Sequence, residues 1–211
     1  MSQLKQKLYD PLKYRLDSFR FFIRKHLTKN LSSKHLFKKN SIKLTEIQND
    51  ILESIKKKGF AKSSLKELFY NGDQILDNFL SIVESLKKTD DYKNSVDFFN
   101  ENFDETGKHY IHRLNDNKNF KIDLNSDLIN FILSDEILDI VNSYFELYAK
   151  LNTADLWITF LNKDKNKRTN AQRWHRDRDD VKILKVFLFL NDITENDGPT
   201  DYISYSRKKE K

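Results

Sequence analysis

Apolar residues recur at helical spacing through much of the chain between residues 45 and 145. The first such segment begins with a capping-box pattern at Thr45 and Gln48 and ends at Gly59, a residue type well suited to a helix C-cap. Its apolar face is marked by isoleucines at regular intervals: Ile47, Ile51 and Ile55. This pattern predicts a helix that ends at Gly59.

A second capping-box pattern, formed by Ser64 and Glu67, predicts a short helix that Gly72 closes. Asp73 is a suitable N-cap for the helix that follows. That helix has an apolar stripe at the expected period: Ile75, Phe79, Ile82 and Leu86. The polar residues 87–94 then predict a loop.

Short strands are predicted on both sides of these helices. Residues 60–63 form one, and residues 110–114 and 120–124 alternate between apolar and polar side chains. Ser126 and Ser134 are candidate caps of two further helices. The longer of these two helices has one apolar face: Leu133, Ile137, Val141 and Tyr144.

The pattern changes after residue 150, where short apolar runs alternate with polar loops. Four strands are predicted in this part of the chain: residues 156–161, 172–177, 183–190 and 202–205. Helices followed by antiparallel strands are typical of the α+β class. We therefore expect an α+β fold with N-terminal helices and a β-rich second half.

Residues 1–41 are interpreted as a basic helical arm that is broken near Pro11. Its apolar residues fall at helical spacing: Leu12, Leu16, Phe19, Ile23 and Leu27. Residues 1–45 contain 12 Lys and Arg against 2 acidic residues, and the remainder contains 26 against 30. Such a helix can lie on an anionic membrane or contact nucleic acid, and it can also dock its apolar face on the main domain.

Composition narrows the class of protein. The chain of 211 residues is 38% hydrophobic and 33% charged, which is enough apolar material for one substantial core. The absence of cysteine excludes disulfides and thiolate metal sites. No apolar run reaches the length of a membrane span, and the first residues lack the apolar core of a signal peptide. A cytoplasmic protein is the expectation.

Candidate chemistry lies in residues 172–177, where His175 and Asp177 are two positions apart. On an extended segment, side chains at i and i+2 point to the same face, so both can reach one metal ion. An imidazole and a carboxylate are two of the three ligands in the facial triad of non-haem Fe(II) oxygenases. His109 and His112 lie in or beside a predicted strand, where surface or packing roles fit better than a metal site.

The surrounding sequence makes this pair more specific. The run QRWHRD at residues 172–177, the run KVFLFLND at 185–192 and the pair Gly198-Pro199 together resemble the phytanoyl-CoA dioxygenase family. This family is a branch of the Fe(II)/2-oxoglutarate-dependent oxygenases. The segment LTEI at residues 44–47, leading to KGF at 58–60, resembles the opening of the same family.

The resemblance implies that residues 42–211 belong to a double-stranded β-helix, or jelly roll, with iron at its mouth. His175 and Asp177 would bind Fe(II), and Gln172 would lie beside the cosubstrate 2-oxoglutarate or the substrate. The expected reaction is hydroxylation of a small organic molecule with O2. No specific nucleic-acid partner is expected.

The sequence also departs from the family pattern. The family places a second His ligand and then a 2-oxoglutarate-binding Arg well downstream, whereas no His follows His175 and Arg207 comes too early. A jelly roll needs about eight strands, more than this sequence predicts. We therefore expect the N-terminal portion of an oxygenase. The alternative is a non-catalytic remnant or binding protein whose basic arm contacts an acidic partner or a membrane surface.

Overall fold

The computed structural model describes residues 30–101, 111–113, 126–160, 174–175, 182–197 and 199–204, together with Leu16, Phe19, Phe22 and Ile23. Within these residues its α-helices are α2 (Leu31–Lys39), α3 (Glu46–Lys58), α4 (Leu65–Leu68), α5 (Gly72–Lys87), α6 (Asp90–Glu101), α7 (Asp127–Ile132) and α8 (Asp135–Phe145). Two strands, β1 (Ile111–Arg113) and β2 (Trp157–Thr159), and the short 3-10 helix η3 (Glu195–Asp197) complete the described elements. The fold is α+β and rich in helix.

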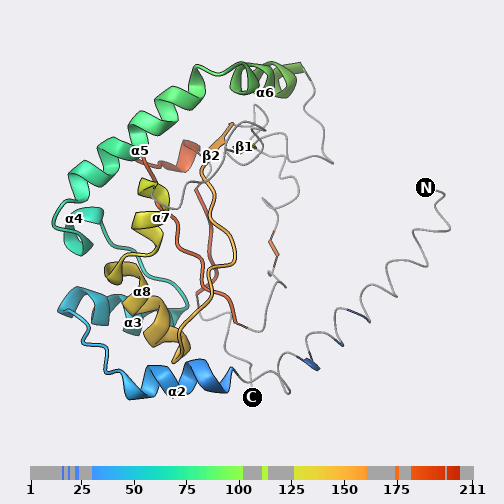
Figure 1. Ribbon diagram of the computed structural model, residues 1–211. Helices are drawn as coiled ribbons and strands as arrows, with labels where there is room; N and C mark the ends of the chain where they lie inside the picture. Colours follow the sequence, from blue (N-terminus) through green and yellow to red (C-terminus); the bar gives the residue numbers. More distant parts are fainter. Residues whose placement is uncertain are drawn as a thin grey trace.

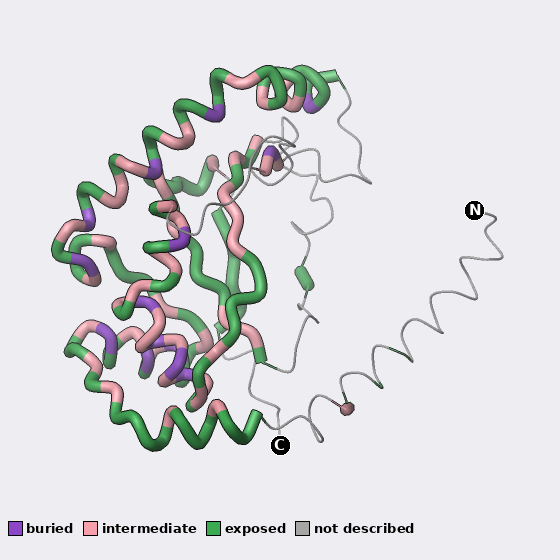
Figure 2. The backbone as a smooth tube through the Cα atoms, viewed as in Figure 1, coloured by how far each residue is buried: buried purple, intermediate pink, exposed green. Residues whose placement is uncertain are grey.

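The helices form an arc around the extended part of the chain. Figure 1 shows α2, α3, α4, α5 and α6 following one another along the outside, with α7 and α8 on the inner side. The extended residues that follow α8 and those from residue 182 onward run side by side within this arc. Buried positions gather where α3 meets α8 and along the inner side of α5, whereas the extended segments remain largely exposed (Figure 2).

The main core lies between α3 and α8. Four buried side chains form its centre: Leu52, Ile55, Ile140 and Tyr144. Leu184, from the apolar run after the His175 region, packs against the same cluster. Gln48 joins the two helices because its side-chain amide donates to the carbonyl of Glu136 at 3.2 Å. The early helix and the late apolar run therefore share one core.

Two aromatic clusters attach the remaining elements. Phe131 of α7 contacts Phe69 and Phe79, with ring centroids 5.4 Å and 5.7 Å apart. At the other end, Phe160 lies 5.2 Å from Phe99 and 5.9 Å from Tyr92, which fixes the end of β2 against α6. Aromatic side chains bury a large apolar area, so these contacts contribute strongly to holding the elements together.

The local cap signals are confirmed at three helix starts. Thr45 with Gln48 and Ser64 with Glu67 both form reciprocal capping boxes. The Ser126 side chain accepts the backbone N–H of Ile129. Gly59 ends α3 with φ of 92°, a conformation that glycine adopts without steric cost. Ser134 occupies its predicted N-cap position, but its hydroxyl donates to the Phe131 carbonyl instead.

The predicted loop at residues 87–94 is wrong, because α6 begins at Asp90. Thr89 joins the two helices: its hydroxyl donates to the Leu86 carbonyl at 2.7 Å and accepts the Tyr92 N–H at 3.2 Å. The acidic pair Asp90 and Asp91 suits the first turn of a helix, where the macrodipole is positive. Polar residues here mark a helix start rather than a loop.

Gly72 begins α5 instead of closing α4, which ends before Phe69. A Cβ at Gly72 would lie 2.7 Å from the backbone carbon of Leu65, so a side chain would clash with the start of α4. The N-cap position of α5 belongs to Asn71, and Asp73 lies in the first turn, where its carboxylate pairs with Lys66 at 2.9 Å. The close approach of α4, and not the end of a helix, therefore explains why glycine occupies this position.

Some of the predicted strands are confirmed and others are wrong. β1 and β2 form an antiparallel pair with His112 opposite Ile158, within two of the predicted segments. Residues 60–63, 183–190 and 202–204 are not strands in the structure, whereas residues 120–124 lie outside the described part. The chain after α3 is held by side-chain contacts instead: Ser54 donates to the Phe60 carbonyl at 2.9 Å.

Helix α2 packs against the chain just after α8. The Ser33 hydroxyl donates to the Tyr148 carbonyl at 2.8 Å, and Asn40 donates to the Tyr148 hydroxyl at 2.9 Å. Phe37 meets the same tyrosine ring edge-on at 6.2 Å. Within the described part of the chain, no helix has both the length and the apolar content needed to cross a bilayer.

Candidate functional site

The residues of the predicted iron site are only partly described. His175 is exposed, and Trp174 beside it has 60% of its surface accessible. Gln172 and Asp177 lie outside the described residues. The predicted pairing of His175 with Asp177 therefore stays a prediction.

The chain that follows the motif is anchored to α8. Lys182 donates to the Tyr144 carbonyl at 2.5 Å, and its ammonium lies 3.9 Å from the centre of the Tyr144 ring. A cation at the last turn of a helix is favoured because the carbonyl end of the helix carries partial negative charge. Leu184 adds an apolar contact with the core. The apolar run is thus anchored at Leu184, seven positions after Asp177 in the sequence.

An aromatic row continues along this run and reaches β2. The ring of Phe187 lies 6.4 Å from Trp157 in β2 and 6.4 Å from Phe189 on its other side. These side chains are 42% to 54% exposed. Arg113 of β1 covers the other part of the row, with its guanidinium 5.3 Å from the Trp157 ring centre. The run therefore lies beside the two-stranded sheet through ring contacts.

His112, in β1, has a packing role. Its side chain is 4% exposed, its Nδ1 forms a 2.8 Å hydrogen bond with the Ser95 hydroxyl, and Tyr92 meets its ring edge-on. Its Nε2 is buried without a hydrogen-bond partner among the described residues. The Ser95–His112 contact joins residues 17 positions apart in the chain, so no local sequence signal could have revealed it.

Asp139, in α8, is a carboxyl whose pKa is raised. Burial raises the pKa of this carboxyl, and the neighbouring charges of Asp135 and Glu136 raise it further. A raised carboxyl pKa can mark a catalytic acid. Here the causes are the packing of α8 and acidic neighbours on the same helix. We assign it a structural origin.

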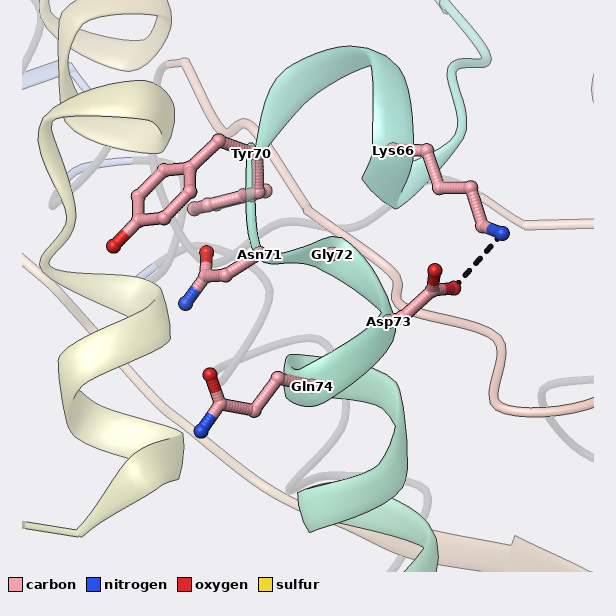
Figure 3. A pocket seen from close by; sticks show the side chains of 7 residues that line it. Lys66, Tyr70, Asn71, Gly72, Asp73 and Gln74 are labelled. Atoms are coloured by element: carbon pink, nitrogen blue, oxygen red, sulfur yellow. Dashed lines mark ion pairs between the residues drawn. The ribbon is translucent and has the colours of Figure 1, made fainter.

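A shallow hollow lies at the junction of α4 and α5, lined by Lys66, Phe69, Tyr70, Asn71, Gly72, Asp73 and Gln74. Figure 3 shows Lys66 and Asp73 meeting on one side, whereas Tyr70, Asn71 and Gln74 extend to the other side. The polar groups therefore do not converge on one point. Among the described residues, no group of three or more His, Cys, Asp and Glu side chains could hold a metal ion.

Comparison with known proteins adds no relative: no protein-family model, curated protein or solved structure matches the chain. The candidate site must be judged by the chemistry of its own residues. Three features bear on that chemistry: the exposed His175, its spacing from Asp177, and the run after them, which is anchored to α8.

Proposed function

We propose that the chain contains the iron-binding segment of an Fe(II)/2-oxoglutarate-dependent oxygenase of the phytanoyl-CoA dioxygenase type. Its substrate class would be a small organic molecule that is hydroxylated with O2. The observation that carries the proposal is an exposed His175 two residues before Asp177, immediately ahead of a long apolar run. Residues 42–211 would belong to a double-stranded β-helix.

The donor set fits the metal. Imidazole nitrogen and carboxylate oxygen are the protein ligands of the facial triad, and this triad leaves the remaining coordination positions open. Bound iron would supply the means to activate O2 with 2-oxoglutarate as the co-reductant. His175 and Asp177 would hold the metal, and Gln172 would contact the cosubstrate or the substrate.

The surroundings of the apolar run support this proposal. The run is extended and not helical, and Phe187 contacts Trp157 of β2, as expected for a neighbour of the sheet. Lys182 and Leu184 attach its start to α8 and to the core. A ligand segment needs such fixed surroundings, because the open positions of a metal centre are useful only when the ligands are held in place.

The third protein ligand is the main departure from the triad. No His follows His175 in the sequence. His112 is buried and its Nδ1 is hydrogen-bonded to Ser95, so it is not accessible to iron ions in solution. Two protein ligands hold a metal less tightly than three. The proposal therefore predicts measurable but weakened Fe(II) binding, and it makes binding a better readout than turnover.

The test is a calorimetric titration of the tag-free chain with Fe(II) under nitrogen. We expect one weak site, whose affinity falls at least about tenfold in His175→Ala and in Asp177→Ala, because each variant removes a metal ligand. The matched control is His35→Ala, which removes an exposed imidazole of α2 and should leave the affinity unchanged.

Equal affinity in the wild type, His175→Ala and Asp177→Ala would contradict the proposed iron site. A loss of equal size in His35→Ala would contradict it too, because the binding would then follow the number of histidines. Circular dichroism of all four proteins separates loss of ligand from loss of fold.

A further inference from the structure

The N-terminal arm exposes apolar side chains on a helical segment. Leu16, Phe19 and Phe22 are helical and are 54%, 62% and 55% exposed, and Ile23 is helical and half-buried. Positions 16, 19 and 23 follow helical spacing and lie on one face. The expected docking of this face on the main domain is not observed for these residues. Leu16 and Phe19 are therefore exposed apolar residues on this face.

The following helix of the arm adds an outward basic face. Ser33, Phe37 and Asn40 turn toward Tyr148. Helical spacing then places Lys38 and Lys39 away from that side of α2 and Lys34 on its flank. Lys34, Lys38, Lys39 and His35 are all exposed. Leu31, at the start of the same outward side, is 69% exposed. Thus α2 is attached by one side and presents lysines on the other.

We propose that the arm binds the surface of an anionic lipid bilayer. Its binding residues are the apolar pair Leu16 and Phe19 and the lysine trio Lys34, Lys38 and Lys39. The apolar pair would enter the boundary between headgroups and acyl chains, and the lysine trio would contact anionic headgroups. The arm would lie on the bilayer and not cross it.

Charge and exposure together favour a bilayer over other acidic partners. Residues 1–45 contain 12 Lys and Arg against 2 acidic residues, which gives strong complementarity to an anionic surface. Nucleic acids bind basic segments mainly through phosphate contacts, which do not need exposed Leu and Phe. A helix with apolar residues on one face and basic residues around it is typical of interfacial membrane binding.

The test is co-sedimentation of the full chain with vesicles at physiological salt. One vesicle preparation is phosphatidylcholine alone, and the other contains phosphatidylcholine mixed with phosphatidylserine. We expect binding to the mixed vesicles and little binding to the neutral ones. Each lysine near an anionic surface is worth about fivefold in affinity, so the triple variant Lys34→Gln, Lys38→Gln, Lys39→Gln should bind on the order of a hundredfold more weakly.

The apolar contribution is tested with the double variant Leu16→Ser, Phe19→Ser, which leaves the net charge unchanged. We expect its affinity for mixed vesicles to fall about tenfold or more, because two exposed apolar side chains no longer enter the bilayer. The matched charge control is Lys56→Gln, Lys57→Gln, Lys58→Gln in α3, whose lysines are also exposed. The apolar control is Tyr70→Ser, at a residue that is 99% exposed.

Three results would overturn the proposal. The first is equal binding to neutral and mixed vesicles, and the second is an equal loss in the arm variants and their controls. The third is full vesicle binding by the Leu16→Ser, Phe19→Ser variant, which would show attraction by charge alone. Tight binding to duplex DNA or RNA that is unaffected by the serine substitutions, with no vesicle binding, would identify a nucleic-acid arm instead.

Discussion

Gly59 shows how one residue couples a helix end to a distant part of the chain. Its backbone has φ of 92°, and a Cβ placed there would collide with the hydroxyl of Tyr202 and lie 3.2 Å from its Cζ. Tyr202 also packs on Phe60, with ring centroids 5.3 Å apart. α3 and residues 199–204 are far apart in sequence. Substitutions at this contact therefore report whether residues 199–204 pack against the end of α3.

We expect Gly59→Ala to lower the free energy of unfolding by about 1–2 kcal/mol, from left-handed backbone strain together with the contact on Tyr202. In a Tyr202→Phe background the colliding hydroxyl is gone, so the same substitution should cost less, by on the order of 0.5 kcal/mol. Urea unfolding of the four proteins in this cycle measures both quantities. Strict additivity would show that Tyr202 does not contact Gly59.

At the scale of elements, two capping boxes with the same local pattern differ in the contacts that they make with other helices. In the first, Gln48 is 4% exposed, accepts the Thr45 N–H at 2.8 Å and also donates to the Glu136 carbonyl. In the second, Glu67 is exposed and bonds only to Ser63 and Ser64, and these bonds hold the pKa of its carboxyl below the ordinary value. Only the first box joins two helices.

Gln48→Glu keeps the acceptor for the Thr45 N–H but replaces the amide donor that faces α8. We expect it to destabilise the fold by about 1–3 kcal/mol, because a buried carboxylate oxygen would then face the Glu136 carbonyl. Glu67→Gln makes the reverse exchange in the exposed box and should leave the urea midpoint nearly unchanged. Equal effects in the two boxes would mean that the α3–α8 bridge contributes nothing beyond the cap.

The helix starts could be predicted from sequence because a capping box is complete within four residues. Helix α6 could have been found by the same reasoning, from Thr89 followed by two acidic residues and by Tyr92, Val96 and Phe99 at helical spacing. The role of Gly72 could not, because it depends on the approach of the Leu65 backbone. Extended segments were harder still, since strand pairing depends on partners that the local pattern does not contain.

The whole molecule joins its early helices to its late extended chain through few contacts. Leu184 packs on the α3–α8 core, Lys182 holds the end of α8, and Phe187 meets Trp157. The candidate ligands could be proposed from sequence because residue type and spacing alone define the His175–Asp177 pattern. The partners of His112 could not, because Ser95 and Tyr92 reach it only through the tertiary fold.

The central claim is that iron binds at His175 and Asp177, and iron-directed backbone cleavage tests it most directly. Fe(II) with ascorbate and peroxide generates oxidants that cut the chain close to the bound metal, and mass spectrometry locates the cuts. We expect cleavage concentrated within residues 172–178 of the wild type and lost in His175→Ala, with His35→Ala unchanged. Cleavage at other positions, or the same cleavage within residues 172–178 in His175→Ala, would contradict the assignment.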